Sequence, residues 1–483
     1  MKRLALVGLA LALPATAISD EHWFDNLLAM ARPGGADDGA WFEALKDAGD
    51  DELLYRVLHY MPKGGDLHNH NSGSSYPEDW LRVALAQEER GYVYYTKTRI
   101  ENCRDYDKAG FPYLLLFRNI VAAEYETLSD CEKNEYTRLD QLDDEQKEGW
   151  LNSIMLDKPS EGREEFFGTH WQRLNALWEN PHIRADLLVN NMELLKADNG
   201  LYLETQIGLR GARRPDGQPI SNDEVMDIFR ARLAQPDALA TGITVRVQLA
   251  LLRFLPSAED DLRELYAAGA RHADLIVAMN MVGREDNDFG YPRRFLPVLR
   301  EMRQKYDLRL SIHAGEVDEP NAHVRDTLLL GADRIGHGIN LITDDETMLD
   351  MRNGPYLVEI NLISNLLLGY VVDYSQHPFP EYLRTDIPVA LSTDDRGMWD
   401  STLSDEFYVA VREFDLTWDE IKLLGRNSLE YAFVEPAVKQ KLIAEYERNI
   451  GKFERQMQSG NLAKLGEMPE TRGFICARYQ LCN

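Results

Sequence analysis

The stretch Met61-Pro-Lys-Gly-Gly-Asp-Leu-His-Asn-His70 decides how the rest of the chain is organised. Two glycines before Asp66 predict a turn, after which a short strand ending at His70 is expected. Because side chains alternate along a strand, His68 and His70 would point to the same face and could hold one ion. A lone His-x-His pair is more often a surface or core pair, so its meaning depends on ligands from other strands.

Seven further β-rich runs follow this first strand, and helical stretches separate them. The runs cover residues 201–207, 244–251, 275–282, 308–313, 333–337, 356–360 and 389–393. Strands that alternate with helices imply parallel βαβ units, and eight such strands predict an α/β protein with a closed (β/α)8 TIM barrel. An open doubly wound sheet is the alternative, although no Gly-x-Gly-x-x-Gly motif follows the first strand to support a dinucleotide fold.

Two regions depart from the alternation of strands and helices that a barrel requires. Residues 18–60 predict an N-terminal helical segment with a break at Pro33-Gly34-Gly35 and a second helix over 40–60. We expect this segment to pack on the body of the same chain, here taken as residues 61–483, with a homodimer contact as the alternative. Between residues 92 and 150 the alternation of strands and helices is interrupted, which predicts an insertion after the first strand, on the functional face of the barrel.

The first residues predict export. Lys2 and Arg3 precede an apolar stretch over residues 4–13 that is too short to span a bilayer comfortably. Ala15-Thr16-Ala17 then offers a cleavage site. Residues 1–17 are therefore expected to be a signal peptide, and the mature protein to be periplasmic or secreted.

The charge and the cysteine content of the chain limit which binding partners and which cellular compartment are expected. The 483-residue chain carries a formal net charge of −28, and such an acidic surface repels phosphate backbones and anionic membranes. We therefore expect neither a nucleic-acid nor a membrane partner. The four cysteines fall into two sequence-local pairs. In an oxidising compartment these pairs predict two disulfides, Cys103–Cys131, which would staple the insertion, and Cys476–Cys482.

Polar clusters follow four of the predicted strands, at the end where the active site of a barrel lies. Besides the His-x-His pair, the clusters are Ser311-Ile-His313-Ala-Gly-Glu316, Arg334-Ile-Gly-His337-Gly and Leu391-Ser-Thr-Asp394-Asp395. Three imidazoles and a carboxylate suit a borderline divalent ion, Zn²⁺ first, with one position open for water. Such an ion acidifies water near neutral pH, a further histidine can take a proton, and a carboxylic acid can give one to the substrate.

These motifs resemble those of the adenosine deaminases of the amidohydrolase superfamily. The similarity runs from about residue 61 to residue 431 and keeps the order of the family's motifs. The Met-Pro-Lys-Gly-Gly run, the export signal and the cysteine-bearing insertion are especially similar to the secreted adenosine deaminase-related growth factors. In those proteins the insertion is a receptor-binding-like module and an N-terminal helical segment dimerises.

The resemblance implies one Zn²⁺ per subunit and a purine nucleoside as substrate. The implied metal ligands are His68, His70, His313 and Asp394. His337 would orient and deprotonate the attacking water, Glu316 would donate a proton to purine N1, and Asp395 would hydrogen-bond N7. The backbone of Gly283 would meet N3. Hydroxide addition at C6 and loss of ammonia would then convert adenosine or 2′-deoxyadenosine to the inosine nucleoside.

Three positions depart from the family pattern. Ser72, kept as a substrate-binding candidate, stands where cytosolic members carry the Asp that meets the sugar 5′-hydroxyl, and Ile363 stands where many carry Pro. Arg396 replaces a common Pro, and it would either meet an anionic group of the substrate or face solvent at a helix start. The alternative functions are deamination of another 6-aminopurine nucleoside or nucleotide, or a non-catalytic extracellular binding or signalling protein on the same fold.

Overall fold

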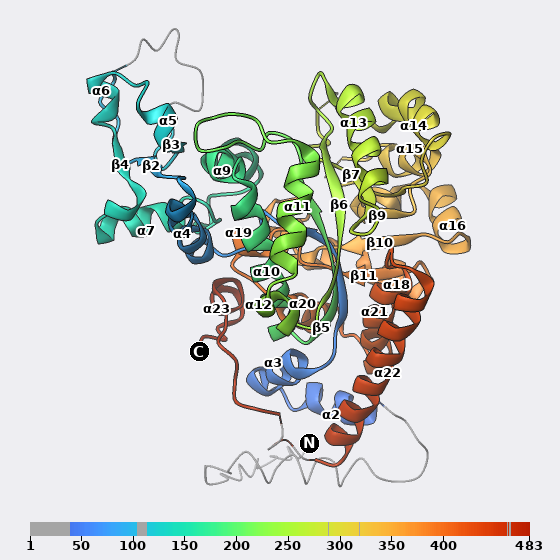
Figure 1. Ribbon diagram of the computed structural model, residues 1–483. Helices are drawn as coiled ribbons and strands as arrows, with labels where there is room; N and C mark the ends of the chain where they lie inside the picture. The colour runs from blue at the N-terminus through green and yellow to red at the C-terminus, as the bar shows by residue number, and fades with distance from the viewer. Residues whose placement is uncertain (1–38, 104–113, 288, 318, 461, 463–464) are drawn as a thin grey trace, which may run out of the picture.

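Eight parallel strands form the central sheet of the computed structural model, which describes residues 39–103, 114–287, 289–317, 319–460, 462 and 465–483 (Figure 1). The strands lie in the order β1-β5-β6-β7-β8-β9-β10-β11. Their bounds are Gly64–His70, Gly200–Ile207, Thr244–Leu252, Ile276–Val282, Arg309–Ala314, Arg334–His337, Leu357–Ile360 and Val389–Leu391. Each predicted β-rich run corresponds to one of these strands, and no end differs by more than two residues.

The sheet closes on itself between its first and last strands. Asn69 forms an isolated parallel bridge with Asp394. The His70 N–H donates to the Asp394 carbonyl at 3.1 Å, and the Asp394 N–H donates to the His68 carbonyl at 2.9 Å. The closed (β/α)8 barrel is therefore confirmed, and the open doubly wound sheet is wrong.

Helices cover the barrel between successive strands. α10 (Pro181–Ala197) leads into β5. The later helices are α11 Asn222–Leu233, α12 Pro236–Ala240, α13 Ala258–Arg271, α14 Leu296–Arg303, α15 His323–Leu330, α16 Asp345–Asn353, α17 Leu362–Leu367, α18 Phe379–Arg384, α19 Arg396–Trp399, α20 Leu403–Phe414, α21 Trp418–Glu430, α22 Pro436–Gln458 and α23 Gly473–Tyr479. Apolar strand residues such as Val247, Leu310 and Ile335 are completely buried, as expected for parallel strands covered by helices.

The described part of the N-terminal segment contains two helices where one was expected over 40–60. These are α2 (Ala40–Asp47) and α3 (Asp51–Tyr60). Gly49 adopts a positive φ of 67°, which favours glycine and ends the first helix. The Asp50 side chain accepts a hydrogen bond from the Leu53 N–H at 2.9 Å and so starts the second helix.

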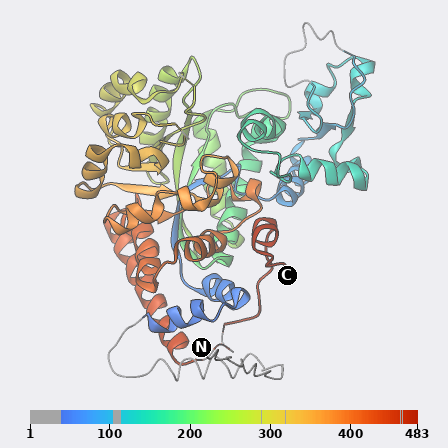
Figure 2. The same ribbon diagram turned by 180° about the vertical axis from the view of Figure 1, so that it is seen from behind.

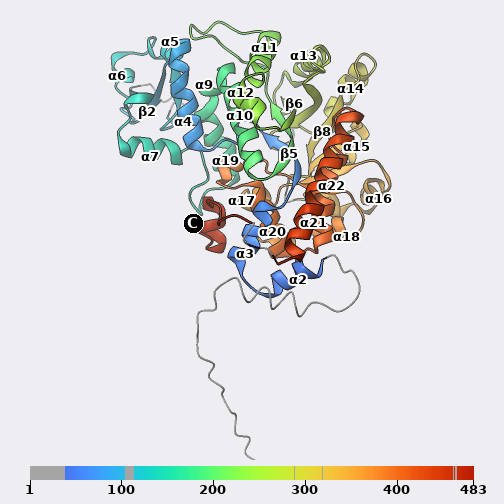
Figure 3. The same cartoon turned by 60° about the horizontal axis from the view of Figure 1, so that its bottom comes forward.

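These two helices pack on the body of the same chain (Figure 3). The Trp41 ring of α2 lies 4.9 Å from that of Trp418 on α21 and 6.3 Å from that of Phe453 on α22. This agrees with the packing expected from the sequence, and the homodimer contact stays a prediction. The expected signal peptide over residues 1–17 and the Pro33-Gly34-Gly35 break lie outside the described residues.

The insertion forms a small layer that projects from one side of the barrel (Figures 1 and 2). Its antiparallel sheet has the order β3-β2-β4, with bounds Asn119–Val121, Tyr94–Lys97 and Tyr136–Arg138. The helices α5 Ala122–Tyr125, α6 Asp130–Lys133 and α7 Asp144–Asn152 accompany it. Both predicted disulfides, Cys103–Cys131 in the insertion and Cys476–Cys482 near the end of the chain, are confirmed.

Three helices connect β1, the insertion and the barrel. α4 (Pro77–Ala86) precedes the insertion, and α8 (Arg163–Glu165) and α9 (Trp171–Trp178) follow it. A π-helical turn over Phe166–His170 joins α8 to α9. Within the described residues, no helix combines the length and the apolar character needed to cross a bilayer.

Candidate active site

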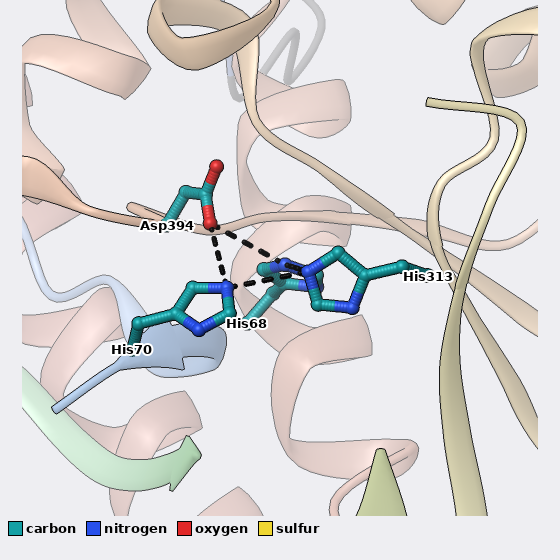
Figure 4. A group of neighbouring side chains, drawn as sticks. All are labelled: His68, His70, His313 and Asp394. Carbon is teal, nitrogen blue, oxygen red and sulfur yellow. Dashed lines mark hydrogen bonds and ion pairs between the residues drawn. The ribbon is translucent and has the colours of Figure 1, made fainter. Parts of the chain in front are cut away.

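Four side chains converge at the carboxyl ends of β1, β8 and β11 (Figure 4). The Nε2 atoms of His68 and His70 lie 3.1 and 3.2 Å from Nε2 of His313. The same two atoms lie 3.5 and 3.1 Å from Oδ1 of Asp394. The four predicted metal ligands, which come from distant parts of the chain, thus offer atoms within 4.8 Å of one another.

Hydrogen bonds behind two of these imidazoles determine which nitrogen faces the centre. Glu359 Oε2 lies 2.7 Å from His68 Nδ1, and Asn280 Oδ1 lies 2.8 Å from His313 Nδ1. Because a carboxylate and an amide oxygen only accept, each ring carries a proton on Nδ1, and its Nε2 presents a lone pair to the centre whenever that atom is not protonated. Lone pairs at 3.1 Å repel one another unless a cation lies between them, so the donor set fits a divalent ion.

The charges around these imidazoles also favour a cation. Burial lowers the pKa of His68, but Asp394 and Glu359 overcome this effect and raise the pKa to about 10. Burial and the neighbouring imidazoles hold the pKa of His313 well below its usual value. The centre therefore attracts positive charge beside its carboxylates, and a bound metal ion would supply that charge.

A chain of buried polar side chains inside the barrel joins the supports of these two histidines. Asn280 Nδ2 donates to Gln248 Oε1 at 2.9 Å, and Gln248 Nε2 donates to Glu204 Oε1 at 2.9 Å. Arg334 donates to Glu204 and, at 2.6 Å, to Glu359. The sequence analysis assigned no role to these side chains. The signal that could have revealed them is the presence of charged and amide residues within otherwise apolar strands.

Glu316, the predicted proton donor, lies beside the metal ligands. Its Oε1 atom is 3.7 Å from Nε2 of His337, and the residue is buried. Burial and the nearby charge of Asp394 raise the pKa of Glu316 well above its usual value. The raised pKa favours the protonated carboxyl group, which is the form that a general acid requires.

Glu285, which was not expected from the sequence, fixes the turn that carries Glu316. Its buried carboxylate accepts from the Glu316 N–H at 3.2 Å and from the N–H of the preceding glycine at 3.0 Å. It also lies 2.7 Å from Nδ1 of His323 and 3.8 Å from Arg253. Since Arg253 donates to the His313 carbonyl at 2.8 Å, one buried ion pair supports both the metal ligand and the acid.

A relay of hydrogen bonds sets the orientation of His337. The Phe379 N–H donates to Nδ1 of His377 at 3.1 Å, which leaves His377 Nε2 to donate to Oδ1 of Asn365 at 3.0 Å. Asn365 Nδ2 then donates to His337 Nδ1 at 2.9 Å. Burial lowers the pKa of His337 to about 3, so the ring is neutral and carries its proton on Nε2, which lies 4.0 Å from Oδ2 of Asp394. This tautomer suits the orienting role predicted for His337, and its role as a proton acceptor stays a prediction.

The remaining predicted site residues line a cavity of about 390 Å³, whose wall also includes Glu316 and three of the predicted metal ligands, His70, His313 and Asp394. Oδ1 of Asp395 is buried and has no hydrogen-bond partner among the described residues. A Cβ atom at Gly73 would overlap that carboxylate, so glycine leaves room for it. Gly283 adopts a φ of 101°, and a side chain there would meet the Phe254 ring. Ser72 lines the same cavity.

Arg396 occupies neither of the positions considered from the sequence. The residue is completely buried and does not line the cavity. Its guanidinium donates to the Asn191 carbonyl at 3.0 Å and lies 3.9 Å from Asp198. It therefore faces neither an anionic substrate nor solvent, and both expectations are wrong. At the other departure, the Ile363 N–H donates to Glu406 at 3.2 Å, a bond that a proline could not make.

Comparison with known proteins identifies relatives over most of the barrel. Residues 140–448 match the adenosine deaminase family. The chain is 30% identical to an adenosine deaminase of Vibrio vulnificus over 249 residues, which cover 51% of this chain and 72% of that protein. It is 28% identical to an adenosine deaminase of Clostridium kluyveri over 171 residues, which cover 35% of this chain and only 48% of that protein.

Solved structures share the fold at lower identity. A complex of ADAL with IMP matches with a TM-score of 0.61 and 22% identity over 82% of this chain and 99% of that one. The N6-mAMP deaminase of Arabidopsis matches with a TM-score of 0.59 and 22% identity over 81% and 99%. An amidohydrolase of Burkholderia ambifaria with bound Zn matches with a TM-score of 0.61 and 17% identity over 84% and 95%.

The barrel, the converging imidazoles and carboxylates, and these relatives define a metal-dependent aminohydrolase. The chain belongs to the adenosine deaminase family, as its motifs predicted. The family match includes His313, His337 and Asp394, and the structure adds His68 and His70 to them by geometry.

Proposed function

We propose that this protein catalyses the zinc-dependent hydrolytic deamination of adenosine and 2′-deoxyadenosine to the inosine nucleosides and ammonia. The observation that carries the proposal is the convergence of three imidazoles and the Asp394 carboxylate at a cavity that the buried Glu316 also lines. When bound, a divalent ion acidifies water, so that hydroxide is available near neutral pH. The zinc-bound relative supports the choice of metal.

The residues of the chain would hold the purine in one orientation. Glu316 would donate a proton to ring N1, which makes C6 more electrophilic. Burial and Asp394 raise the pKa of Asp395 well above its usual value, so a protonated Asp395 would donate to N7 from the carboxyl group whose Oδ1 lacks a partner, and the Gly283 backbone N–H would donate to N3. His337 would hold the attacking water on one face of the ring. C6 would then gain the oxygen of water and lose its amino group as ammonia.

Ultraviolet spectroscopy of adenosine conversion tests this proposal. Zinc-replete protein should convert adenosine to inosine with the accompanying loss of absorbance. A chelator should stop the reaction, and added Zn²⁺ should restore it. If the metal-replete protein converts no aminopurine, the proposal is wrong and a non-catalytic extracellular binding or signalling function is favoured.

Another 6-aminopurine is the alternative substrate. It is suggested by the solved relatives, which include an IMP complex of ADAL and an N6-mAMP deaminase. The burial of Arg396 away from the cavity removes one group that would favour a nucleotide. A panel containing adenosine, 2′-deoxyadenosine, AMP and N6-methyl-AMP decides between these substrates, because the preferred one has the highest kcat/KM.

We also propose that the protein is exported and is of the secreted growth-factor type. The insertion after β1 and the pairing of all four cysteines in disulfides support this assignment. Mass spectrometry of the purified periplasmic and secreted fractions should find a mature N-terminus near residue 18. An intact residue 1 in a cytoplasmic protein would contradict export. Light scattering of the mature protein tests the homodimer.

A further inference from the structure

Gln206 is a buried amide that faces the cavity without a hydrogen-bond partner. It lies near the end of β5, in register with His70 on β1. The residue is 2% exposed, and neither its Nε2 nor its Oε1 atom has a partner among the described residues. Buried amides are normally hydrogen-bonded, so free donor and acceptor atoms on a cavity wall point to a bound ligand.

The cavity wall on this side is apolar. Leu174, Trp178 and Leu209 line the cavity together with Gln206. The Trp178 ring lies 6.3 Å from that of Trp80, whose indole N–H donates to the Ser72 carbonyl at 3.1 Å. The end of the cavity next to Ser72 is therefore walled by aromatic and aliphatic side chains.

The cavity offers little positive charge to a phosphate. Among the described lining residues, Arg210 is the only lysine or arginine. Its guanidinium is paired with Asp261 and lies 3.6 Å from Glu264. The other acidic lining residues are Glu316, Asp394 and Asp395. A phosphate at this end would meet an arginine that is already neutralised, in a cavity rich in carboxyl groups.

We propose that this end of the cavity binds an uncharged pentose with an apolar 5′ substituent, such as a 5′-alkylthio group, and that Gln206 binds the sugar hydroxyls. The inference rests on the proposed function, in which Glu316, Asp395 and Gly283 contact the purine. A sugar hydroxyl both donates and accepts, which matches the free amide of Gln206. The short, neutral side chain of Ser72 leaves space for the substituent.

Steady-state kinetics of the zinc-loaded enzyme tests the substrate class. The kcat/KM for 5′-deoxy-5′-methylthioadenosine should be more than about one tenth of that for adenosine, and it can exceed it. The kcat/KM for AMP should fall below that for adenosine by about tenfold or more. The proposal is overturned if the kcat/KM for the methylthio nucleoside is lower than that for adenosine by about tenfold or more. It is also overturned if the kcat/KM for AMP is within about tenfold of that for adenosine.

The Gln206→Leu variant tests the sugar contact, because it removes both hydrogen-bonding atoms at similar size. Wild type should prefer adenosine to 2′,3′-dideoxyadenosine by about tenfold or more. The variant should lose this preference through a higher KM for adenosine, while its kcat for the dideoxy substrate is retained. Gln172→Leu is the matched control, since Gln172 also lines the cavity but its amide oxygen already accepts from Asn175 at 3.0 Å. A preference that survives in Gln206→Leu contradicts the assignment.

Ligand binding separates a failure of this inference from a failure of the proposed function. If the loaded enzyme converts no aminopurine, calorimetry with 5′-deoxy-5′-methylthioinosine and IMP still tests the subsite. Tighter binding of the methylthio compound, weakened in Gln206→Leu, supports the subsite. Equal or tighter binding of IMP, or an unchanged affinity in the variant, overturns it.

Discussion

The barrel mouth and the insertion are stabilised by different forces. Behind the predicted metal ligands, Arg334 and Glu359 form an ion pair in which both side chains are completely buried. The insertion contains one buried ion pair, Lys97–Glu135, but others such as Lys133–Glu126 are open to solvent, and a disulfide joins the layer covalently. Buried polar contacts fix the positions of their neighbours far more strongly than exposed pairs do. Changes at the mouth should therefore alter chemistry, and changes in the insertion should leave it intact.

The largest effect is expected for Glu316→Gln, which removes the proposed proton donor and keeps the shape of its side chain. We expect kcat to fall by about 10²–10⁴-fold with the metal still bound. Glu319→Gln is the matched control, because Glu319 is an exposed carboxylate three residues further on. Kinetics and metal analysis check this prediction, which fails if Glu316→Gln turns over at close to the parental rate.

A smaller effect is expected for Glu285→Gln, because the amide accepts hydrogen bonds less well from the turn that carries Glu316. Displacement of the acid should lower kcat by about 10–100-fold and change KM less. Glu264→Gln, at an exposed acid on α13, should change neither constant. A variant that melts at a lower temperature but keeps its kcat would show that Glu285 only stabilises the fold.

Metal affinity is the readout for Glu359→Gln. The carboxylate orients His68, so its loss should weaken zinc binding by about 10–100-fold. Ser311→Ala is a graded control, because it removes only one hydrogen bond, of 2.8 Å, to Glu359 and should weaken binding less. Competition with a chelator of known affinity measures both, and equal affinities in wild type and Glu359→Gln would contradict the orienting role.

The smallest effect on turnover is expected in the insertion. Replacing Cys103 and Cys131 by serine opens a link between residues 28 positions apart and should lower the local stability of the insertion by about 3 kcal/mol. Hydrogen exchange should become faster in β2–β4, while kcat/KM is unchanged. The same replacement of Cys476 and Cys482 should leave exchange in the insertion as it was. A drop in turnover with either pair would show that the two regions are coupled.

The barrel and its ligands were predictable because the signals are local. Most strands are short apolar runs, and His313 and Asp394 stand at or just after the ends of such runs, whereas β1 was predicted from its glycine turn and its His-x-His pair. The strands of the insertion were harder to place, because β3 and β4 have three residues each and show no periodicity. The break between α2 and α3 depends on the positive φ of Gly49 and the cap at Asp50, which together override an otherwise continuous helical pattern.

The supporting contacts could not be derived from neighbouring residues. Arg396 is buried because Asn191 and Asp198, from a distant part of the chain, receive its guanidinium. The roles of Glu285 and Gln206 likewise depend on the tertiary position of their side chains, not on a motif. Sequence therefore indicates which groups do chemistry, and tertiary structure shows what orients them.

The position of the metal ligands has a further consequence for the barrel itself. His68 and His70 belong to β1 and Asp394 follows β11, so these ligands lie on opposite sides of the seam at which the cylinder closes. A single ion would thus cross-link the two ends of the sheet. Because only the closed form can bind it fully, a hundredfold excess of zinc over its Kd would stabilise closure by about 2.7 kcal/mol. The cation proposed to activate water would therefore also stabilise the closed barrel.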